Sequence, residues 1–221
     1  MSAARDTRLA LIGDVHGNAA ALRAVLAAVA DAGIARGVNA GDLVMRGTHP
    51  RGAIRLIRAT GWPTVIGNTD QKVGRGNPRP VGHPASERPG SRSWTIRRLD
   101  DEQVEWLADL PDRVELDVGG FTVLVTHGHP GDLSVVPDVD TPATDLVRIA
   151  KKLRVDAVVT GHTHRPFARR HGGTLFVNPG SVGEGTKDDL RPSWAWLEAK
   201  GGRLVAHLER VDEPLAPPRS A

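Results

Sequence analysis

The chain has 221 residues, 39% of them hydrophobic and 25% charged, which is typical of one compact domain with a sizeable core. It has no cysteine, and this excludes disulfides, thiolate nucleophiles and cysteine-ligated zinc. The net charge of +3 is too small to indicate a class of partner. The sequence shows neither a signal peptide nor a bilayer-spanning hydrophobic stretch, so we expect a cytoplasmic protein that does not enter a membrane.

The first part of the chain alternates short apolar runs with helical patterns. The runs Arg8–Asp14, Gly37–Asp42 and Pro63–Asn68 predict strands that end in polar residues. Hydrophobic residues recur with a helical period over Asn18–Gly33 and again over 51–61. Strands and helices in this order are joined by right-handed crossovers, which favours an α/β fold with a parallel portion in its sheet.

The segment after the third strand is rich in glycine, proline and arginine. Between Lys72 and Arg98 it carries seven basic side chains and one acidic one, Glu87. We therefore expect a basic loop or small cap at residues 71–95. It is either a solvated loop or an electropositive rim that attracts a phosphate-bearing substrate.

The second half of the chain continues with helices and strands, and it contains no internal repeat. Glycine pairs mark two expected hairpin turns, at Gly119–Gly120 and Gly201–Gly202. The expected elements are a helix over 100–111, a hairpin over 113–128, a helix over 141–156 capped by Thr141, strands over 157–160 and 174–181, and a hairpin over 193–211. With a flexible tail at 212–221, these segments make one domain over residues 1–221.

Metal-capable side chains follow the apolar runs at the point where each run ends. In open α/β sheets ligands bind at the carboxyl ends of the strands, so we expect these side chains to converge on one edge. They are Asp14 and His16, Asp42, Asn68, His127, and His162 with His164.

Seven such groups suffice for two ions if one carboxylate bridges them, and Asp42 is the natural bridge because it has two oxygens. Nitrogen and oxygen ligands without sulfur suit manganese, our first expectation, and iron, zinc, cobalt or nickel better than calcium. Two ions about 3.5–4 Å apart can clamp a phosphate and deprotonate a shared water. The residues therefore predict one pocket that holds a pair of metal ions.

The order of these blocks resembles the calcineurin-like metallophosphoesterase superfamily over roughly residues 8 to 211. The matching blocks are "DVH" (Asp14–His16), "GD" (Gly41–Asp42), "GNTD" (Gly67–Asp70), "THG" around His127, "GHTH" (Gly161–His164) and "NPGSVG" (Asn178–Gly183). The resemblance implies an α/β fold of four layers, an αββα sandwich in which two facing mixed sheets are flanked by helices.

The same resemblance implies a dinuclear centre in which a metal-bridging hydroxide attacks phosphorus in line with the leaving oxygen. One divalent ion would be bound by Asp14, His16, Asp42 and His164, and the other by Asp42, Asn68, His127 and His162. The catalytic residues would be Asp42, Arg46, Asn68 and His127, and the substrate contacts Arg46, Asn68 and Thr69. Arg46 of "GDLVMRG" matches the arginine that grips the phosphate in the protein phosphatase branch.

Two departures from the family pattern affect the chemistry. Thr69 stands where many members have a histidine that protonates the leaving group, and Met45 replaces the aspartate that supports it. General acid catalysis raises a rate about 10²–10⁴-fold, so its loss should slow the hydrolysis of alkyl esters most and that of nitrophenyl esters least. His83 in the basic segment or His129 could replace the missing acid.

The function predicted is hydrolysis of a small phosphodiester or phosphomonoester, with nucleotides among the candidates. The alternatives are a protein Ser/Thr or dinucleotide-polyphosphate phosphatase, and a non-catalytic scaffold of the same fold. Nucleic acid is disfavoured because Trp94 is the only aromatic side chain in the basic segment. The sequence leaves the native metal and the oligomeric state open.

Overall fold

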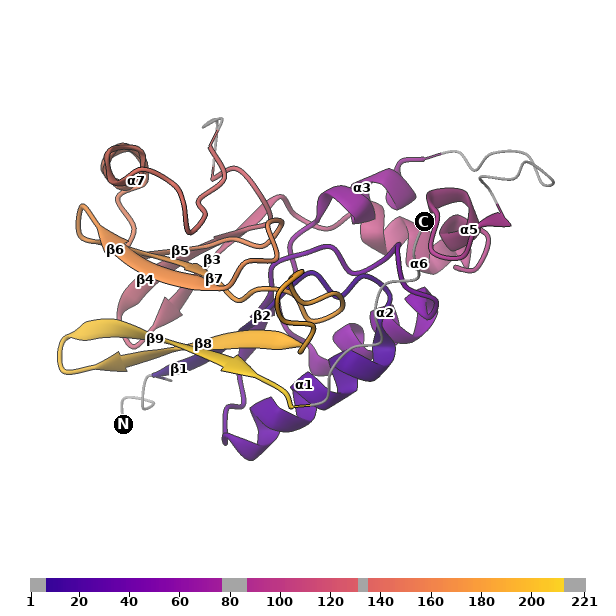
Figure 1. The fold of residues 1–221 in the computed structure, drawn as a ribbon, viewed down its shortest axis with the longest axis horizontal. Helices are drawn as coiled ribbons and strands as arrows, with labels where there is room; N and C mark the ends of the chain where they lie inside the picture. Colours follow the sequence, from indigo (N-terminus) through magenta and orange to yellow (C-terminus); the bar gives the residue numbers. More distant parts are fainter. Residues whose placement is uncertain (1–6, 77–86, 131–134, 213–221) are drawn as a thin grey trace.

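A computed structural model describes residues 7–76, 87–130 and 135–212 of the chain, and two mixed β-sheets face each other within it (Figure 1). In bonding order, the first sheet consists of β2 (Gly37–Asn39), β1 (Arg8–Ile12), β8 (Ser193–Lys200) and β9 (Arg203–Arg210). The second consists of β3 (Arg113–Val118), β4 (Phe121–Thr126), β5 (Ala157–Val159), β7 (Thr174–Asn178) and β6 (Phe167–His171). The pairs β1–β2, β4–β5 and β5–β7 are parallel, and the other neighbours are antiparallel.

Helices cover the outer faces of both sheets. The first sheet packs against two long helices, α1 (Ala19–Asp31) and α2 (Pro50–Thr60), and the second sheet is covered by α7 (Ala143–Leu153; Figure 1). Three shorter helices, α3 (Asn68–Gly74), α5 (Arg92–Ile96) and α6 (Asp101–Ala108), pack together at one end of the molecule.

Side chains alternate between the two faces of each strand, and this alternation separates the core into layers. In β1, Leu9 and Leu11 pack between the two sheets, whereas Ala10 and Ile12 face the helices of the first sheet. In β5, Val158 likewise points outward and packs under α7. The predicted arrangement of two mixed sheets flanked by helices is thus confirmed.

The segment Pro63–Asn68, predicted as a strand, forms only a single bridge, between Thr64 and Asn39. Its neighbour β2 ends at Asn39, earlier than predicted. The chain then turns, because Gly41 and Asp42 have φ values of 92° and 56°. Since no extended partner remains beyond Asn39, the pairing stops after one residue.

The basic segment predicted as a loop at 71–95 contains more helix than expected. α3 extends to Gly74, and α5 begins at Arg92. Both helices are too short to show a clear hydrophobic period, and their polar, glycine-rich surroundings concealed them. Residues 77–86 of this segment, and residues 213–221 of the predicted tail, lie outside the described residues.

Two smaller differences concern the second sheet and its helix. The strand β6 has no predicted counterpart, because its sequence FARRH is mostly polar and it pairs only with β7, at the edge of the sheet. Thr141 does not cap α7: Pro142 occupies that position, and the Thr141 hydroxyl accepts the N–H of Asp138 over 2.8 Å. In the described part of the chain, no helix combines the length and hydrophobicity needed to cross a bilayer.

Candidate metal centre

The loops that follow β1, β2, β4 and β5 meet at one edge of the sheets. The N–H of Asp14 donates to the carbonyl of Gly41, and the N–H of Gly161 donates to the carbonyl of His127, both over 2.9 Å. These bonds tie the loops together in pairs. The side chains brought to this edge are all seven that the strand ends predicted: Asp14, His16, Asp42, Asn68, His127, His162 and His164.

The backbone of these loops adopts conformations that L-residues ordinarily avoid. Eight non-glycine residues in the described ranges have positive φ, and only Arg154, which ends α7, lies elsewhere. Each such residue costs on the order of 1 kcal/mol, so their concentration is typical of a functional site. The other seven are Asp14, His16, Asp42, Met45, Arg46, His162 and His164, with φ from 48° to 71°.

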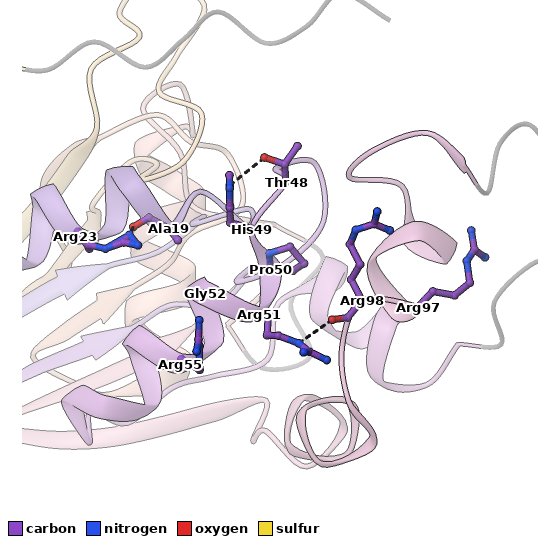
Figure 2. Close-up of a pocket in the computed structure, with 10 residues that line it drawn as sticks. All are labelled: Ala19, Arg23, Thr48, His49, Pro50, Arg51, Gly52, Arg55, Arg97 and Arg98. Carbon is purple, nitrogen blue, oxygen red and sulfur yellow. Dashed lines mark hydrogen bonds between the residues drawn. The ribbon is translucent and has the colours of Figure 1, made fainter.

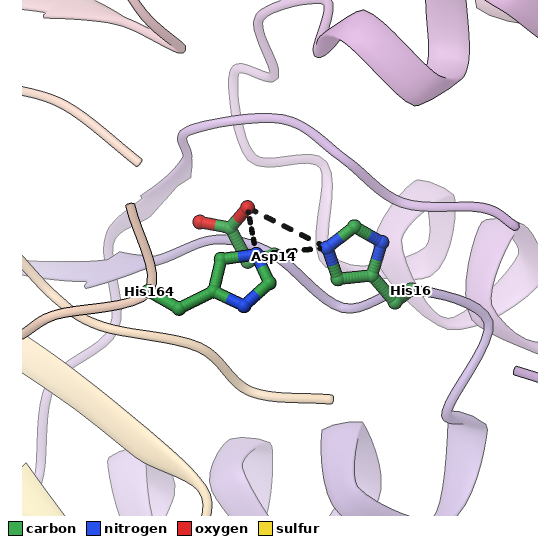
Figure 3. A group of neighbouring side chains, drawn as sticks. All are labelled: Asp14, His16 and His164. Atoms are coloured by element: carbon green, nitrogen blue, oxygen red, sulfur yellow. Dashed lines mark hydrogen bonds and ion pairs between the residues drawn. The ribbon is translucent and has the colours of Figure 1, made fainter. Parts of the chain in front are cut away.

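Asp14, His16 and His164 form the first group of side chains (Figure 3). The Nε2 atoms of the two histidines are 3.0 Å apart. Asp14 Oδ1 lies 3.1 Å from Nε2 of His164 and 3.7 Å from Nε2 of His16. The three atoms therefore point into the same small space, which is buried on the side of Asp14 and His16 and partly open at His164.

Asn68, His127 and His162 form the second group. Oδ1 of Asn68 lies 3.1 Å from Nε2 of His127 and 2.8 Å from Nδ1 of His162. The two ring nitrogens are themselves 3.4 Å apart. His127 is buried and His162 is exposed, so this group also has one side open to solvent.

Asp42 lies between the two groups. Its Oδ2 is 3.7 Å from Nε2 of His16, and its Oδ1 is 3.4 Å from Nε2 of His127. The N–H of Thr69 donates to Oδ1 over 2.8 Å and fixes the orientation of the carboxylate. One carboxylate thus presents a different oxygen to each group, which is the arrangement that a bridging ligand needs.

The atoms of this centre fit a divalent cation. Nδ1 of His127 donates to the carbonyl of Ala40 over 2.8 Å, so the neutral ring has a lone pair on Nε2. That lone pair faces oxygens of Asn68 and Asp42, which are acceptors too, and Oδ1 of Asp14 is buried without a hydrogen bond. Crowded acceptors repel one another unless a cation lies among them, and this mixture of nitrogen and oxygen suits transition-metal ions.

The pKa shifts of the centre agree with this reading. Burial lowers the pKa of His16, and partial burial lowers the pKa of His162, which favours neutral rings with free lone pairs. Burial acts to raise the pKa of Asp14, but the His164 ring 3.1 Å away and the other nearby histidines outweigh it, so the pKa is lowered. For His164, burial acts to lower the pKa, and the Asp14 carboxylate outweighs it and raises the pKa. The shifts therefore favour an ionised Asp14 and neutral His16 and His162, the forms that bind a metal ion.

The predicted phosphate-binding Arg46 lies at the open side of the centre, where it meets a residue that was not predicted. Its guanidinium donates to Oε2 of Glu184 over 2.5 Å, and the same oxygen lies 3.4 Å from Nδ1 of His164. A carboxylate behind the outer nitrogen of a histidine fixes the tautomer and the ring orientation. Nothing local in the sequence shows that the loop after "NPGSVG" returns to His164.

We expect Glu184→Ala to weaken metal binding about 10–100-fold, because the His164 ring loses the group that orients it. The measurement is a titration of the metal-free chain with Mn²⁺, with Glu184→Gln expected to restore most of the affinity through its amide oxygen. The control is Glu198→Ala, which removes a glutamate that pairs with Arg8 on the first sheet. Equal metal affinities in Glu184→Ala and the wild type would contradict this positioning role.

Thr69, predicted to contact substrate, is buried, and its hydroxyl donates to the carbonyl of Val44 over 2.9 Å. Contact between Thr69 and a substrate therefore stays a prediction. Of the two histidines considered as replacement acids, His83 lies outside the described residues, and His129 is exposed. In the described part of the chain, no hydrogen bond or ion pair joins the His129 ring to the metal-capable residues.

Asp70 is a second residue whose role was not predicted. Its buried carboxylate accepts the N–H groups of Leu43 (2.8 Å), Val44 (3.2 Å) and Gly67 (3.0 Å). Burial and the neighbouring charge of Asp42 raise its pKa to about 7. Asp70 thus ties the start of α3 to the loop that carries Asp42.

The block Asn178–Gly183 supports the same loops from the other side. The Asn178 side-chain amide donates to the carbonyl of Gly161 over 2.7 Å, and the Ser181 hydroxyl donates to the carbonyl of Asp14 over 2.9 Å. Neither side chain is among the metal-capable residues. The block therefore fixes the position of the loop that carries Asp14 relative to the loop that carries His162 and His164.

Comparison with known proteins gives consistent matches over most of the chain. A model of the calcineurin-like phosphoesterase superfamily domain matches residues 8–202. The uncharacterized protein MJ0912 of Methanocaldococcus jannaschii is 28% identical over 220 residues, covering 89% of this chain and 84% of that protein.

Solved structures share the fold. A metallophosphoesterase from Sphaerobacter thermophilus superposes with a TM-score of 0.75 at 29% identity, covering 94% of this chain and 89% of that one. Vacuolar Protein Sorting 29 from Cryptosporidium parvum superposes with a TM-score of 0.54 at 18% identity, covering 95% of this chain and all (100%) of that one. At that identity the second likeness concerns the fold alone.

Proposed function

Because the chain belongs to the calcineurin-like phosphoesterase superfamily, we propose that it hydrolyses phosphodiester or phosphomonoester bonds with two divalent metal ions at this centre. The observation that carries the proposal is the position of Asp42. Its two oxygens face His16 and His127, which belong to different groups of side chains. A centre for one ion would not need this shared carboxylate.

The residues that would hold the two ions fall into the two groups of side chains described above, with Asp42 shared between them. One ion would be held by Asp14, His16, Asp42 and His164, and the other by Asp42, Asn68, His127 and His162. When bound, such ions lower the pKa of water so that it can act as the nucleophile, and they offset charge on the phosphate. We take manganese as the first metal to test, and iron, zinc, cobalt and nickel as the next.

The chain itself would bind and orient the ester. The centre is open at His162, His164 and Arg46, so a phosphate enters from that side. The exposed guanidinium of Arg46 matches two phosphate oxygens in shape and charge. In the structure it bonds to Glu184, and an incoming phosphate would compete with that carboxylate for it.

Protonation of the leaving group is the step for which this centre is least equipped. Thr69 is buried and bonded to the backbone, and Met45 replaces the aspartate of the phosphatase branch. No described histidine outside the metal-capable residues is joined to the two groups by a hydrogen bond or an ion pair. The proposed enzyme should therefore prefer esters whose leaving group needs no proton.

The test is hydrolysis by the full chain after its metals are removed with EDTA. We expect no release of nitrophenol from nitrophenyl phosphate or bis(nitrophenyl) phosphate until Mn²⁺ is added, with about two ions bound per chain by elemental analysis. Alkyl phosphates should react about 10²–10⁴-fold more slowly than nitrophenyl esters. Hydrolysis that survives complete metal removal would contradict the proposal.

The same preparation separates the alternatives. A screen of nucleotides, cyclic nucleotides, dinucleotide polyphosphates and phosphopeptides distinguishes a small-ester hydrolase from a protein or dinucleotide-polyphosphate phosphatase. Stoichiometric metal without turnover of any ester would instead favour a scaffold. The seven polar groups argue against a scaffold, because burying and crowding them is costly unless an ion is bound.

A further inference from the structure

A cavity of about 530 Å³ lies at the surface where α1, α2 and the residues after α5 meet (Figure 2). Arg23 comes from α1, Arg51 and Arg55 come from α2, and Arg97 with Arg98 follow α5. None of the residues that line it is acidic. Both long helices begin here, so their positive ends add to the field of the arginines.

Two of the five arginines have carboxylate partners at the rim. Arg97 lies 3.2 Å from Glu87. Arg51 donates to the carbonyl of Arg98 over 3.0 Å and is 3.8 Å from the exposed carboxylate of Asp100. These pairs are exposed to solvent and offset only part of the positive charge.

The other three arginines have no carboxylate partner within the described ranges. Arg23 donates to the carbonyl of Ala19 over 3.2 Å, and Arg98 stacks on the ring of Trp94 at 3.8 Å. Neither contact neutralises the guanidinium. Arg55 forms no hydrogen bond or ion pair with any described residue. The cavity therefore concentrates uncompensated positive charge from three segments of the chain.

We propose that this cavity is a second anion-binding site, which takes an oligophosphate, that is, two or more linked phosphate groups. Its volume lies within the range of small-molecule sites, about 300–1,000 Å³, and exceeds what one phosphate would fill. Guanidinium forks from three segments of the chain line it, and each fork can pair with two phosphate oxygens. No Trp or Phe lines the cavity, so the lining offers no large aromatic ring on which a nucleotide base would stack.

The cavity adjoins the metal centre without sharing its ligands. The N–H of His49, which lines the cavity, donates to the carbonyl of Gly17 over 3.0 Å, and the N–H of Gly47 donates to that of His16 over 2.8 Å. None of the seven metal-capable side chains lines the cavity. Binding here can therefore be measured without turnover. A failure to bind would leave the proposed hydrolysis unaffected, and a lack of hydrolysis would leave this site unaffected.

The test is isothermal titration of the full chain with inorganic tripolyphosphate in EDTA, where the anion cannot bind through metals. We expect one saturable site that weakens with salt and prefers tripolyphosphate to orthophosphate. Arg23→Gln/Arg55→Gln should weaken binding at least about tenfold. Arg148→Gln/Arg203→Gln removes the same charge from exposed arginines on α7 and β9 and should leave binding unchanged.

Several results would overturn the proposal. They are no saturable binding by the wild type, equal weakening by the two double variants, or binding of a single-stranded oligonucleotide but not of tripolyphosphate. ATP should bind about as well as tripolyphosphate, and much tighter ATP binding would contradict recognition by phosphate alone. Thermal melts check that the variants fold, and Arg98→Gln serves if the first double variant does not.

Discussion

Asp42→Asn is expected to lower kcat/KM for nitrophenyl esters at least about a thousandfold, because both metal groups lose the carboxylate that they share. The amide keeps the shape of the side chain and can still accept the N–H of Thr69. It lacks the charge and one of the two acceptor oxygens. Bound metal should fall from about two ions per chain to one or fewer.

The control for this substitution is Asp31→Asn, which changes an exposed aspartate at the end of α1. It should keep both metals and the wild-type rate. Thermal melts of the metal-free proteins should be similar for both variants, which separates loss of the site from loss of the fold. An Asp42→Asn protein that retains two ions and near-normal turnover would contradict the shared-carboxylate model.

Gly67→Ala is expected to destabilise the chain by about 1–3 kcal/mol and to reduce activity about a hundredfold. Gly67 has φ −94° and ψ 168°, which alanine adopts easily, so the effect is one of space. A Cβ at this position would overlap the backbone nitrogen and Oδ1 of Asp42. The loop that carries Asp42 must then move away from the start of α3, and Asn68 moves with it.

Gly128→Ala is the matched control, because it lies beside His127 at the same edge of the sheets. A Cβ there would meet nothing within 4 Å. It should change stability by less than about 0.5 kcal/mol and leave activity as it is. Urea unfolding and nitrophenyl ester assays on both variants provide the comparison. Equal behaviour of the two variants would show that the close approach of Gly67 to Asp42 is unimportant.

The order of strands and helices in the α/β fold was predictable because its signals are local, whereas the layering of two facing sheets was an implication of the family resemblance. The apolar run of β1 and the helical period over α1 are each readable within a few residues, and Asn18 caps α1 as its side-chain type suggests. Elements that depend on a partner were not predictable. Pro63–Asn68 has the composition of a strand, but β2 turns away at Asn39, and β6 exists only because β7 lies beside it.

By itself, the sequence determined which residue types follow the strands, and hence that nitrogen and oxygen ligands such as Asp14, Asp42 and His127 would gather at one sheet edge. Only the tertiary structure decided which oxygen of Asp42 faces which histidine, that Glu184 returns to His164, and that Asp70 holds the Asp42 loop. It also assembled the cavity of five arginines from α1, α2 and the residues after α5. The physical reason is the separation along the sequence. A strand end depends on neighbouring residues, whereas these contacts join positions that folding brings together from distant parts of the chain.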